Sequence, residues 1–257
     1  MSENDYRFSG ISRLYGPEAR EKLEAAHVCV VGVGGVGSWC VEALARSGVG
    51  ELTLIDLDDI CVTNVNRQLH ALDETIGQLK IEVLAKRCKL INPLLKVNIL
   101  AEFFTPKSAD KLLSNKFTYV VDAIDSIENK ILLIDECLKR GQPILTTGAA
   151  AGKQDPTKIL VEDLSKTWND RLLQRVRKTM RQRLGYPRDG RPFNVLSVFC
   201  HELPFFPHED GSVCQIKKED QKNLKLDCNS GYGSATFVTG TFGFVAASEV
   251  VREICKK

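Results

Sequence analysis

The sequence predicts an α/β protein with a doubly wound, mostly parallel sheet and a C-terminal extension. Three observations lead to this fold class. An apolar strand runs into a glycine-rich turn, strand and helix patterns alternate as far as Gly148, and the chain of 257 residues is long enough to bury a large core. Apolar and charged contents of 43% and 26% are those of an ordinary globular protein.

The first unit of this pattern is a strand, a turn and a helix. Residues 28–31 form a continuous apolar run, as in a parallel strand buried on both faces, and residues 38–46 have the character of a helix. The glycines between them follow the pattern G-x-G-x-x-G, which allows a tight turn, the approach of a phosphate and close helix–strand packing. They are Gly32, Gly34, Gly35 and Gly37.

A second strand, Leu52–Ile55, ends at a carboxylate. Asp56 follows Gly34 by 22 residues, the spacing of an acidic residue that binds a ribose hydroxyl. The positive end of the helix dipole would attract a phosphate over the glycine turn. These features predict a Rossmann-like nucleotide site, although close packing of helix and strand produces a glycine turn without any ligand.

The other elements are expected in regular order. We expect residues 1–150 to form the nucleotide-binding core with an N-terminal helix, and residues 151–257 to continue the same domain with a basic insert at 166–191 and a C-terminal helix. Helices are expected at 17–26, 80–91, 106–113 and 130–139, and strands at 96–100, 119–124, 144–147, 158–162 and 195–200. A glycine-rich loop and a helix are expected within 231–254.

Polar residues after Asp56 favour a triphosphate over a dinucleotide. Asn64, Asn66 and Arg67 fall in a long loop at the carboxyl ends of the strands, where ligands of open α/β sheets bind, and Lys80 opens the next helix. The alternative is that these charges are simply solvated.

Two further carboxylates end the strand expected at 119–124. Asp122 and Asp125 lie near the predicted switch point of the sheet and could hold Mg²⁺ on a triphosphate. The alternative for Asp125 is the N-cap of the following helix.

Charge is unevenly distributed. The segment 166–191 has nine basic and two acidic residues, a net charge of +7, which leaves −5 on the rest of a chain of net charge +2. Such a concentration indicates a polyanion-binding surface, or a solvated helical face.

Nine scattered cysteines, an odd number, indicate free thiols and a cytoplasmic protein, because the N-terminus is polar and lacks a secretory signal. No C-x-x-C pair is present, so a four-cysteine zinc site is not expected. We interpret the uncharged run 228–248 as a loop and a buried helix rather than a membrane span.

The motifs together resemble the E1-like adenylating superfamily of ubiquitin-activating and sulfur-carrier-activating enzymes. The similar motifs are GVGGVGS, LIDLDDI, TNVNRQ, GQLK and DAIDS, in the order and spacing of that family across residues 13–148. The resemblance implies ATP and Mg²⁺ as cofactors, adenylation of a carboxylate, and a homodimer in which an N-terminal arginine reaches the partner's ATP. Arg13 is the better candidate and Arg7 the second.

The same resemblance implies roles for individual residues. Asp56 binds the ribose, Asn64, Arg67 and Lys80 hold phosphates, and Asp125 serves Mg²⁺. Asp58 and Ser126 complete the implied nucleotide site. Arg13, Arg67, Lys80 and Asp125 are the residues expected to act in catalysis.

Within the superfamily the chain resembles the bacterial tRNA threonylcarbamoyladenosine dehydratases. The similar segments are RLYG, VCVTNVNRQLHAL, TTGAAAGKQDPT, DGSVC and SGYGSATFVTGTFGFVA. This branch implies a tRNA substrate whose threonylcarbamoyl carboxylate is adenylated and then cyclised, with a cysteine desulfurase or sulfur-acceptor protein as a further implied partner. We expect Arg175, Lys178, Arg181 and Arg183 to grip the tRNA backbone.

Three other functions remain open at the level of the sequence. The chain could activate the C-terminus of a ubiquitin-like protein, it could be an NAD-dependent oxidoreductase, or it could be a catalytically idle partner protein. Cys61, Cys200, Cys214 and Cys228 could each carry a thioester or persulfide, as in other superfamily members, but a buried inert thiol is the simpler interpretation, and no cysteine is assigned a role.

Overall fold

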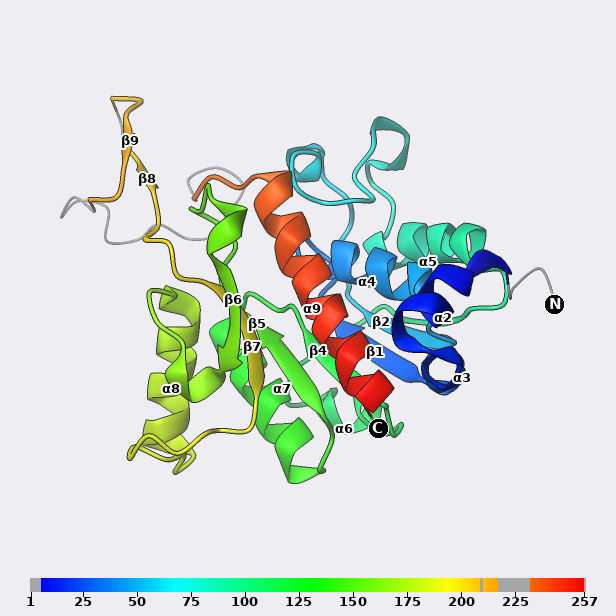
Figure 1. Cartoon of the computed structure of the whole chain (residues 1–257). Helices are drawn as coiled ribbons and strands as arrows, with labels where there is room; N and C mark the ends of the chain where they lie inside the picture. Colours follow the sequence, from blue (N-terminus) through cyan, green and yellow to red (C-terminus); the bar gives the residue numbers. More distant parts are fainter. Residues whose placement is uncertain (1–5, 209, 217–231, 257) are drawn as a thin grey trace.

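A seven-stranded sheet forms the centre of the protein (Figure 1), seen in a computed structural model that describes residues 6–208, 210–216 and 232–256. The strand order is β3-β2-β1-β4-β5-β7-β6, and every neighbouring pair is parallel except β6 with β7. The predicted α/β, doubly wound and mostly parallel sheet is therefore confirmed. The strands are β1 (His27–Val31), β2 (Glu51–Ile55), β3 (Lys96–Leu100), β4 (Tyr119–Asp122), β5 (Ile144–Thr147), β6 (Ile159–Asp163) and β7 (Leu196–Cys200).

Helices cover both faces of the sheet, because the side chains of the central strands are apolar on both faces. In β1, Val28 and Val30 belong to one apolar cluster, while Cys29 and Val31 belong to the other. The first cluster includes side chains of α3 (Pro17–Ala25), α4 (Gly37–Arg46), α5 (Lys80–Ile91) and α9 (Thr236–Lys256). The second includes side chains of α6 (Ala109–Leu112), α7 (Ile127–Lys139) and α8 (Arg171–Arg183).

The C-terminal helix α9 crosses the sheet and lies against α4 (Figure 1). At Gly243 the two helices approach so closely that a Cβ atom would lie 2.6 Å from the Val36 carbonyl oxygen and 2.7 Å from the Trp39 Cβ. The interpretation of residues 236–248 as a buried helix is confirmed, while 228–231 lie outside the described residues. No helix in the described part of the chain is both long and apolar enough to span a membrane.

Some predicted boundaries differ from the structure. The strand expected to reach Ile124 ends at Asp122, whose Oδ1 accepts a hydrogen bond from the Ile124 N at 3.1 Å and turns the chain. The helix expected from Lys130 begins at Ile127, one turn earlier, with an acidic residue in that turn. The short helix expected at 106–113 spans only Ala109–Leu112.

Two further 3₁₀ turns, η3 (Pro156–Lys158) and η4 (Leu164–Lys166), flank β6. Other short elements lie above the carboxyl ends of the parallel strands. They are the 3₁₀ turns η1 (Val62–Asn64) and η2 (Asp73–Thr75) and the hairpin β8 (Phe206–Pro207) with β9 (Val213–Cys214). The chain order reverses between β1 and β4, so this edge of the sheet has a crevice at the switch point, where ligands of doubly wound folds bind. A short N-terminal helix, α2 (Ser9–Tyr15), lies next to α3.

Candidate functional site

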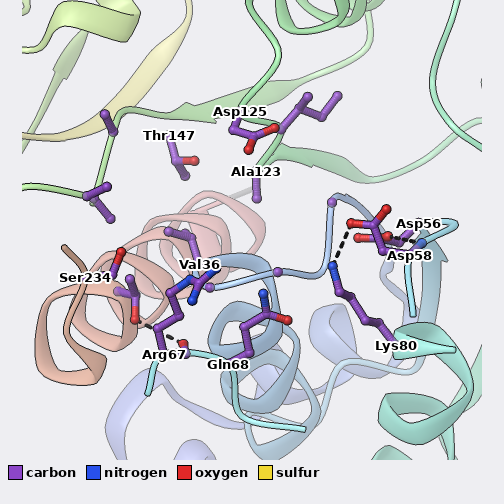
Figure 2. Close-up of a pocket in the computed structure, with 18 of the residues that line it drawn as sticks. Val36, Asp56, Asp58, Arg67, Gln68, Lys80, Ala123, Asp125, Thr147 and Ser234 are labelled. Carbon is purple, nitrogen blue, oxygen red and sulfur yellow. Dashed lines mark hydrogen bonds and ion pairs between the residues drawn. The ribbon is translucent and has the colours of Figure 1, made fainter. Parts of the chain in front are cut away.

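A cavity of about 1260 Å³ lies at the carboxyl ends of the parallel strands. Figure 2 shows Asp56, Asp58 and Lys80 toward one end of it and Ser234 toward the other, with Asp125 and Thr147 on the facing side. The long loop that contains Asn66 and Arg67, residues 57–78, supplies one wall. The cavity therefore joins segments from both halves of the chain.

The glycine turn forms the floor of this cavity. A Cβ on Gly37 would lie 1.9 Å from the Gly32 carbonyl oxygen, so the third glycine is required by the packing of α4 on the turn. At Gly34, by contrast, the described atom nearest to an added Cβ would be the Gln68 Nε2, at an ordinary 3.7 Å. The backbone at Gly34 thus faces the cavity, where a phosphate could approach it.

Asp56 fixes the shape of the turn as well as lining the cavity. Its Oδ2 accepts a hydrogen bond from the Val33 N at 2.8 Å, and its Oδ1 accepts one from the Asp58 N at 2.9 Å. A carboxylate has further lone pairs, so the side chain can also accept a hydrogen bond from a ribose hydroxyl. The role of Asp56 at the ribose stays a prediction.

Lys80 and Asp58 form an ion pair at the rim of the cavity (Figure 2). The Lys80 Nζ lies 2.7 Å from the Asp58 Oδ2, and the lysine side chain is buried while the aspartate is half-exposed. Because Lys80 lines the cavity, an incoming phosphate would compete with Asp58 for its ammonium group. Both residues were predicted to bind the nucleotide, and both line the cavity.

The side chain of Arg67 is held in place by hydrogen bonds to residues of its own loop. Its Nη1 donates to the Thr63 carbonyl oxygen at 2.5 Å and to the Asn66 Oδ1 at 3.2 Å, while its carbonyl oxygen accepts from the Trp39 Nε1 at 3.1 Å. The guanidinium lines the cavity. A guanidinium group that is held in place in advance is suited to stabilise negative charge that forms in a transition state.

The two carboxylates expected to hold a metal ion together are separated, and that part of the prediction is wrong. Asp122 is fully buried: its Oδ2 lies 2.8 Å from the Lys130 Nζ and accepts from the Thr146 Oγ1 at 2.6 Å. Lys130 also donates to the Thr146 Oγ1 at 3.1 Å, so the charge of Asp122 is neutralised beneath the sheet edge. Asp125 alone faces the cavity.

Two other residues that were predicted to bind the nucleotide, Asn64 and Ser126, do not belong to the described lining of the cavity. Asn64 is buried, and its Oδ1 accepts a hydrogen bond from the Cys61 N at 3.1 Å, which closes the turn η1. The neighbouring residues Asn66 and Gln68 line the cavity instead of Asn64. Gly35 also lines it. Ser126 is exposed just before α7, outside the described lining of the cavity.

Arg13 is exposed on α2, and its Nη1 lies 3.4 Å from the Ser9 Oγ. The structure describes a single chain and places Arg13 outside the described lining of the cavity. Its action on a partner's site stays a prediction.

The far end of the cavity is formed by residues that the sequence motifs did not predict to lie together. Its walls come from Thr147–Ala151 at the end of β5, from the β8 end of the hairpin, and from the segment before α9 that contains Tyr232–Ser234. The Asn66 Nδ2 donates to the Ser234 carbonyl oxygen at 2.9 Å, which joins the nucleotide loop to the C-terminal segment. The glycine-rich motifs around residues 148 and 233 were the available signal.

The cysteines considered for catalysis lie in different surroundings. Cys61 is exposed, Cys200 is buried with its thiol pKa raised by burial, and Cys228 lies outside the described residues. Cys214 is half-buried, and its Sγ lies 3.0 Å from the Nε2 of His208, a residue that lines the cavity. All eight cysteines in the described segments are free thiols.

The predicted basic helix is confirmed as α8. Leu172, Leu173, Val176 and Met180 form its buried face, as its apolar spacing indicates. Asp170 is the N-cap: its Oδ1 accepts from the Leu173 N at 2.9 Å, and its Oδ2 accepts from the Ala149 N at 2.9 Å. Burial raises the pKa of this carboxyl group.

The four basic side chains predicted to bind tRNA differ from one another. Arg181 is half-buried and donates to the Pro187 carbonyl oxygen at 3.0 Å, and Arg183 pairs with Glu128 at 3.1 Å. Arg175 and Lys178 are exposed and have no ion pair within the described residues. These two are the cations of the set that are available to an external anion.

The fold and the cavity are those of an α/β nucleotide-binding protein, with a glycine turn in the lining of the cavity. The chain belongs to the ThiF family, whose model matches residues 9–257. The resemblance drawn from the motifs is thereby confirmed.

Two relatives match nearly the whole chain. The tRNA threonylcarbamoyladenosine dehydratase of Escherichia coli (strain K12) is 45% identical over 252 residues, 98% of this chain and 94% of that protein. The protein of the same name from Haemophilus influenzae is 46% identical over 254 residues, 98% and 95% of the two chains. A crystal structure of the E. coli enzyme, TcdA, in complex with ATP has a TM-score of 0.86 at 42% identity, covering 97% of this chain and 94% of that one.

Proposed function

We propose that this protein is an ATP-dependent tRNA threonylcarbamoyladenosine dehydratase. It adenylates the carboxylate of the threonylcarbamoyl group on a tRNA adenosine and then closes that group into a ring. The observation that carries the proposal is similarity over 98% of the chain to proteins of that name, combined with a cavity whose lining supplies nucleotide-binding groups. The absence of any C-x-x-C pair in the sequence favours this substrate over the C-terminus of a sulfur carrier.

The chemistry requires activation because a carboxylate is a poor electrophile. A carboxylate oxygen of the substrate attacks the α-phosphorus of ATP, and pyrophosphate leaves. A nucleophile within the same threonylcarbamoyl group then attacks the activated carbonyl carbon, and AMP leaves with that oxygen. The substrate thus loses the elements of water, and ring closure gains the large effective concentration of an intramolecular reaction.

The cavity lining supplies fixed groups for the first step. Asp56 binds the ribose, and the backbone at Gly34 receives the phosphates over the glycine turn. Lys80 and Arg67 stabilise the negative charge that grows on the α-phosphate, and each is held in place before ATP arrives. The less polar far end, with Ala149–Ala151, accommodates the acyl group.

Asp125 is the residue that would hold Mg²⁺. No cluster of three or more His, Cys, Asp or Glu side chains occurs among residues 6–208, 210–216 and 232–256, so the protein has no complete metal cage there. One carboxylate nevertheless fits, because Mg²⁺ is commonly held by one or two carboxylates together with substrate phosphates and water. When bound, the ion neutralises phosphate charge.

The basic face of α8 carries the tRNA backbone in this proposal. Arg175 and Lys178 supply the contacts to phosphates, since neither is engaged by a carboxylate in the described structure. Arg183 would have to exchange Glu128 for a phosphate, and Arg181 supports the segment after α8. The helix contributes affinity without reading the base sequence.

The assembly is part of the same proposal. The enzyme acts in the cytoplasm as a homodimer in which Arg13 of each protomer completes the nucleotide site of its partner. A sulfur-acceptor protein or cysteine desulfurase remains a predicted partner on family grounds alone.

The direct test is conversion of the modified nucleoside. Purified protein is incubated with ATP, Mg²⁺ and tRNA carrying threonylcarbamoyladenosine, and the nucleosides are analysed by mass spectrometry. The proposal expects ATP-dependent formation of a nucleoside lighter by one water, with AMP and pyrophosphate released in equal amounts. ATP consumption without that nucleoside would contradict it.

A further inference from the structure

A second recess, of about 310 Å³, lies beside the main cavity at the N-terminal end of α8. Its walls include the indole ring of Trp168 and the guanidinium groups of Arg171 and Arg177, with Leu203 and Pro204 opposite. None of these five residues was assigned a role above. The combination of an aromatic ring and two cations is typical of sites that bind single-stranded nucleic acid.

Trp168 is an exposed ring held in a fixed orientation. Its side chain is 45% exposed, which is unusual for tryptophan. Its ring meets that of buried Phe199 edge-on, with centroids 5.0 Å apart and an interplanar angle of 72°, and lies at 30° to the ring of His201 at 5.8 Å. His201 stacks on part of the indole, and 45% of the tryptophan stays exposed, so a planar ligand could stack on the uncovered part of the ring at little entropic cost.

The two arginines of the recess have no carboxylate partner within the described residues. Arg171 lies over the Phe206 ring at 4.8 Å and donates to the Tyr232 Oη at 3.3 Å. Arg177 donates to the Thr167 Oγ1, and its partial burial lowers the pKa of the guanidinium. Arg177 feels the charge of the buried Asp170, but neither arginine forms an ion pair within the described residues. The two guanidinium groups therefore favour the binding of an anion, and of phosphate in particular.

The recess and the main cavity share a wall. Tyr232 lines the main cavity, and its ring lies 5.5 Å from that of Phe206, which lines the recess. Arg171 contacts both rings of this wall. A chain of nucleotides with one residue in the main cavity would therefore bring a neighbouring nucleotide to the recess.

We propose that this recess binds the nucleobase adjacent to the threonylcarbamoyladenosine of the tRNA. The base stacks on Trp168, while Arg171 and Arg177 receive the phosphates that flank it. The inference rests on the proposed function and extends it by naming a contact outside the reacting group. A single-stranded RNA segment fits because its unstacked bases can be splayed out and stacked on aromatic and arginine side chains.

The test compares Trp168→Ala with a matched control, Leu184→Ala. Leu184 is an exposed apolar residue on the same segment, at the opposite end of α8, where it touches neither cavity. Loss of one stacked base should weaken tRNA binding by about 5- to 100-fold for Trp168→Ala, whereas Leu184→Ala should bind like the parent. The KM for ATP should be unchanged in both, and Trp168→Phe, which keeps a ring, should retain most of the affinity.

Abasic tRNAs make the test specific for the neighbouring base. Two tRNAs lack the base on the 5′ or the 3′ side of the modified adenosine, and their binding is titrated directly. For the parent protein one of them should bind about as weakly as intact tRNA binds Trp168→Ala, and Trp168→Ala itself should lose nothing more with that tRNA. Equal losses in parent and variant, or parental affinity of a folded Trp168→Ala, would overturn the inference.

The result is separable from the proposed function. If the parent converts no tRNA in the mass-spectrometric assay, the proposed function fails, whereas the recess is judged by binding of the abasic tRNAs alone. Thermal unfolding of Trp168→Ala shows whether the variant is folded. If it is not, the comparison of Trp168→Phe with the abasic tRNAs decides.

Discussion

Asp170 accepts a hydrogen bond from the backbone N of Ala149 at 2.9 Å and thereby ties the start of α8 to the wall of the main cavity. The packing at this point is tight, because a Cβ on Gly148 would lie 2.1 Å from the Asp170 Oδ2. The helix that carries the basic face is thus fixed to the segment that would surround the acyl group. This contact holds the two parts of the proposed substrate site in a fixed relative position.

This contact makes Asp170 important for stability. Asp170→Ala removes the N-cap of α8 and leaves the Ala149 N–H without its partner, so the free energy of unfolding should fall by about 2–4 kcal/mol. Urea unfolding measures the change. Asp189→Ala, at an exposed carboxylate of the same segment, should stay within about 0.5 kcal/mol of the parent. An equal, small effect for both variants would remove Asp170 from this role.

His70 should make the protein sensitive to mild acid. It is 1% exposed, neither ring nitrogen has a partner in the described structure, and burial lowers its pKa from 6.5 to about 4. Between these values the unfolded chain binds the proton and the folded chain does not. The free energy of unfolding should therefore fall by up to about 3 kcal/mol as the pH drops through this window.

The measurement for His70 is urea unfolding of the parent and of His70→Gln from pH 7 to about pH 4. The variant cannot take up this proton in either state, so its stability should change less with pH over the window. Parallel pH profiles for the two proteins would show that His70 is not the source of the effect.

Asp125 should be needed for ATP turnover. Asp125→Ala removes the one carboxylate of the proposed Mg²⁺ site, and we expect the tRNA-dependent rate to fall by about 100-fold or more with the circular dichroism spectrum unchanged. Asp110→Ala, at an exposed carboxylate outside the described lining of the cavity, is the control. Activity of Asp125→Ala within a few-fold of the parent would exclude the metal role.

The salt dependence of tRNA binding tests the face of α8. Removing one phosphate contact should make the slope of log affinity against log salt shallower by about 0.7–0.9. Arg175→Gln combined with Lys178→Gln should therefore reduce the slope by roughly 1.5 without changing ATP affinity. Arg191→Gln, whose parent side chain pairs with Asp189, should reduce it little. An unchanged slope in the double variant would mean that the tRNA is held elsewhere.

Subunit mixing tests the shared site. Arg13→Ala and Lys80→Ala should each be inactive. A heterodimer of the two contains one site with both residues intact, so an equal mixture should recover about a quarter of the parent activity. No recovery after verified subunit exchange would show that Arg13 does not act across the dimer.

Local sequence pattern predicted some elements to the residue. The helix Lys80–Ile91 was predicted with both its ends, because its apolar spacing is regular and Asn92-Pro93 stops it. The turn glycines and Asp56 were recognisable for the same reason, since their roles depend on neighbours close in the chain.

Contacts between distant segments were not predictable in this way. Asp122 appeared equivalent to Asp125 until the structure showed Lys130 reaching it from the next helix. The far wall of the cavity joins Ala149, His208 and Tyr232 from three separate segments, and no local spacing indicates such a meeting. Likewise Arg181 looks like its neighbours in sequence, but the chain folds back to give it an internal acceptor.

The central claim is that the cavity adenylates the carboxylate of a modified tRNA, and pyrophosphate exchange tests it most directly. Labelled pyrophosphate is incubated with ATP, Mg²⁺ and the protein, with tRNA that either carries or lacks the threonylcarbamoyl group. We predict incorporation of label into ATP only with the modified tRNA, and loss of that incorporation in Lys80→Ala. No exchange with modified tRNA, or equal exchange with both tRNAs, would contradict the account.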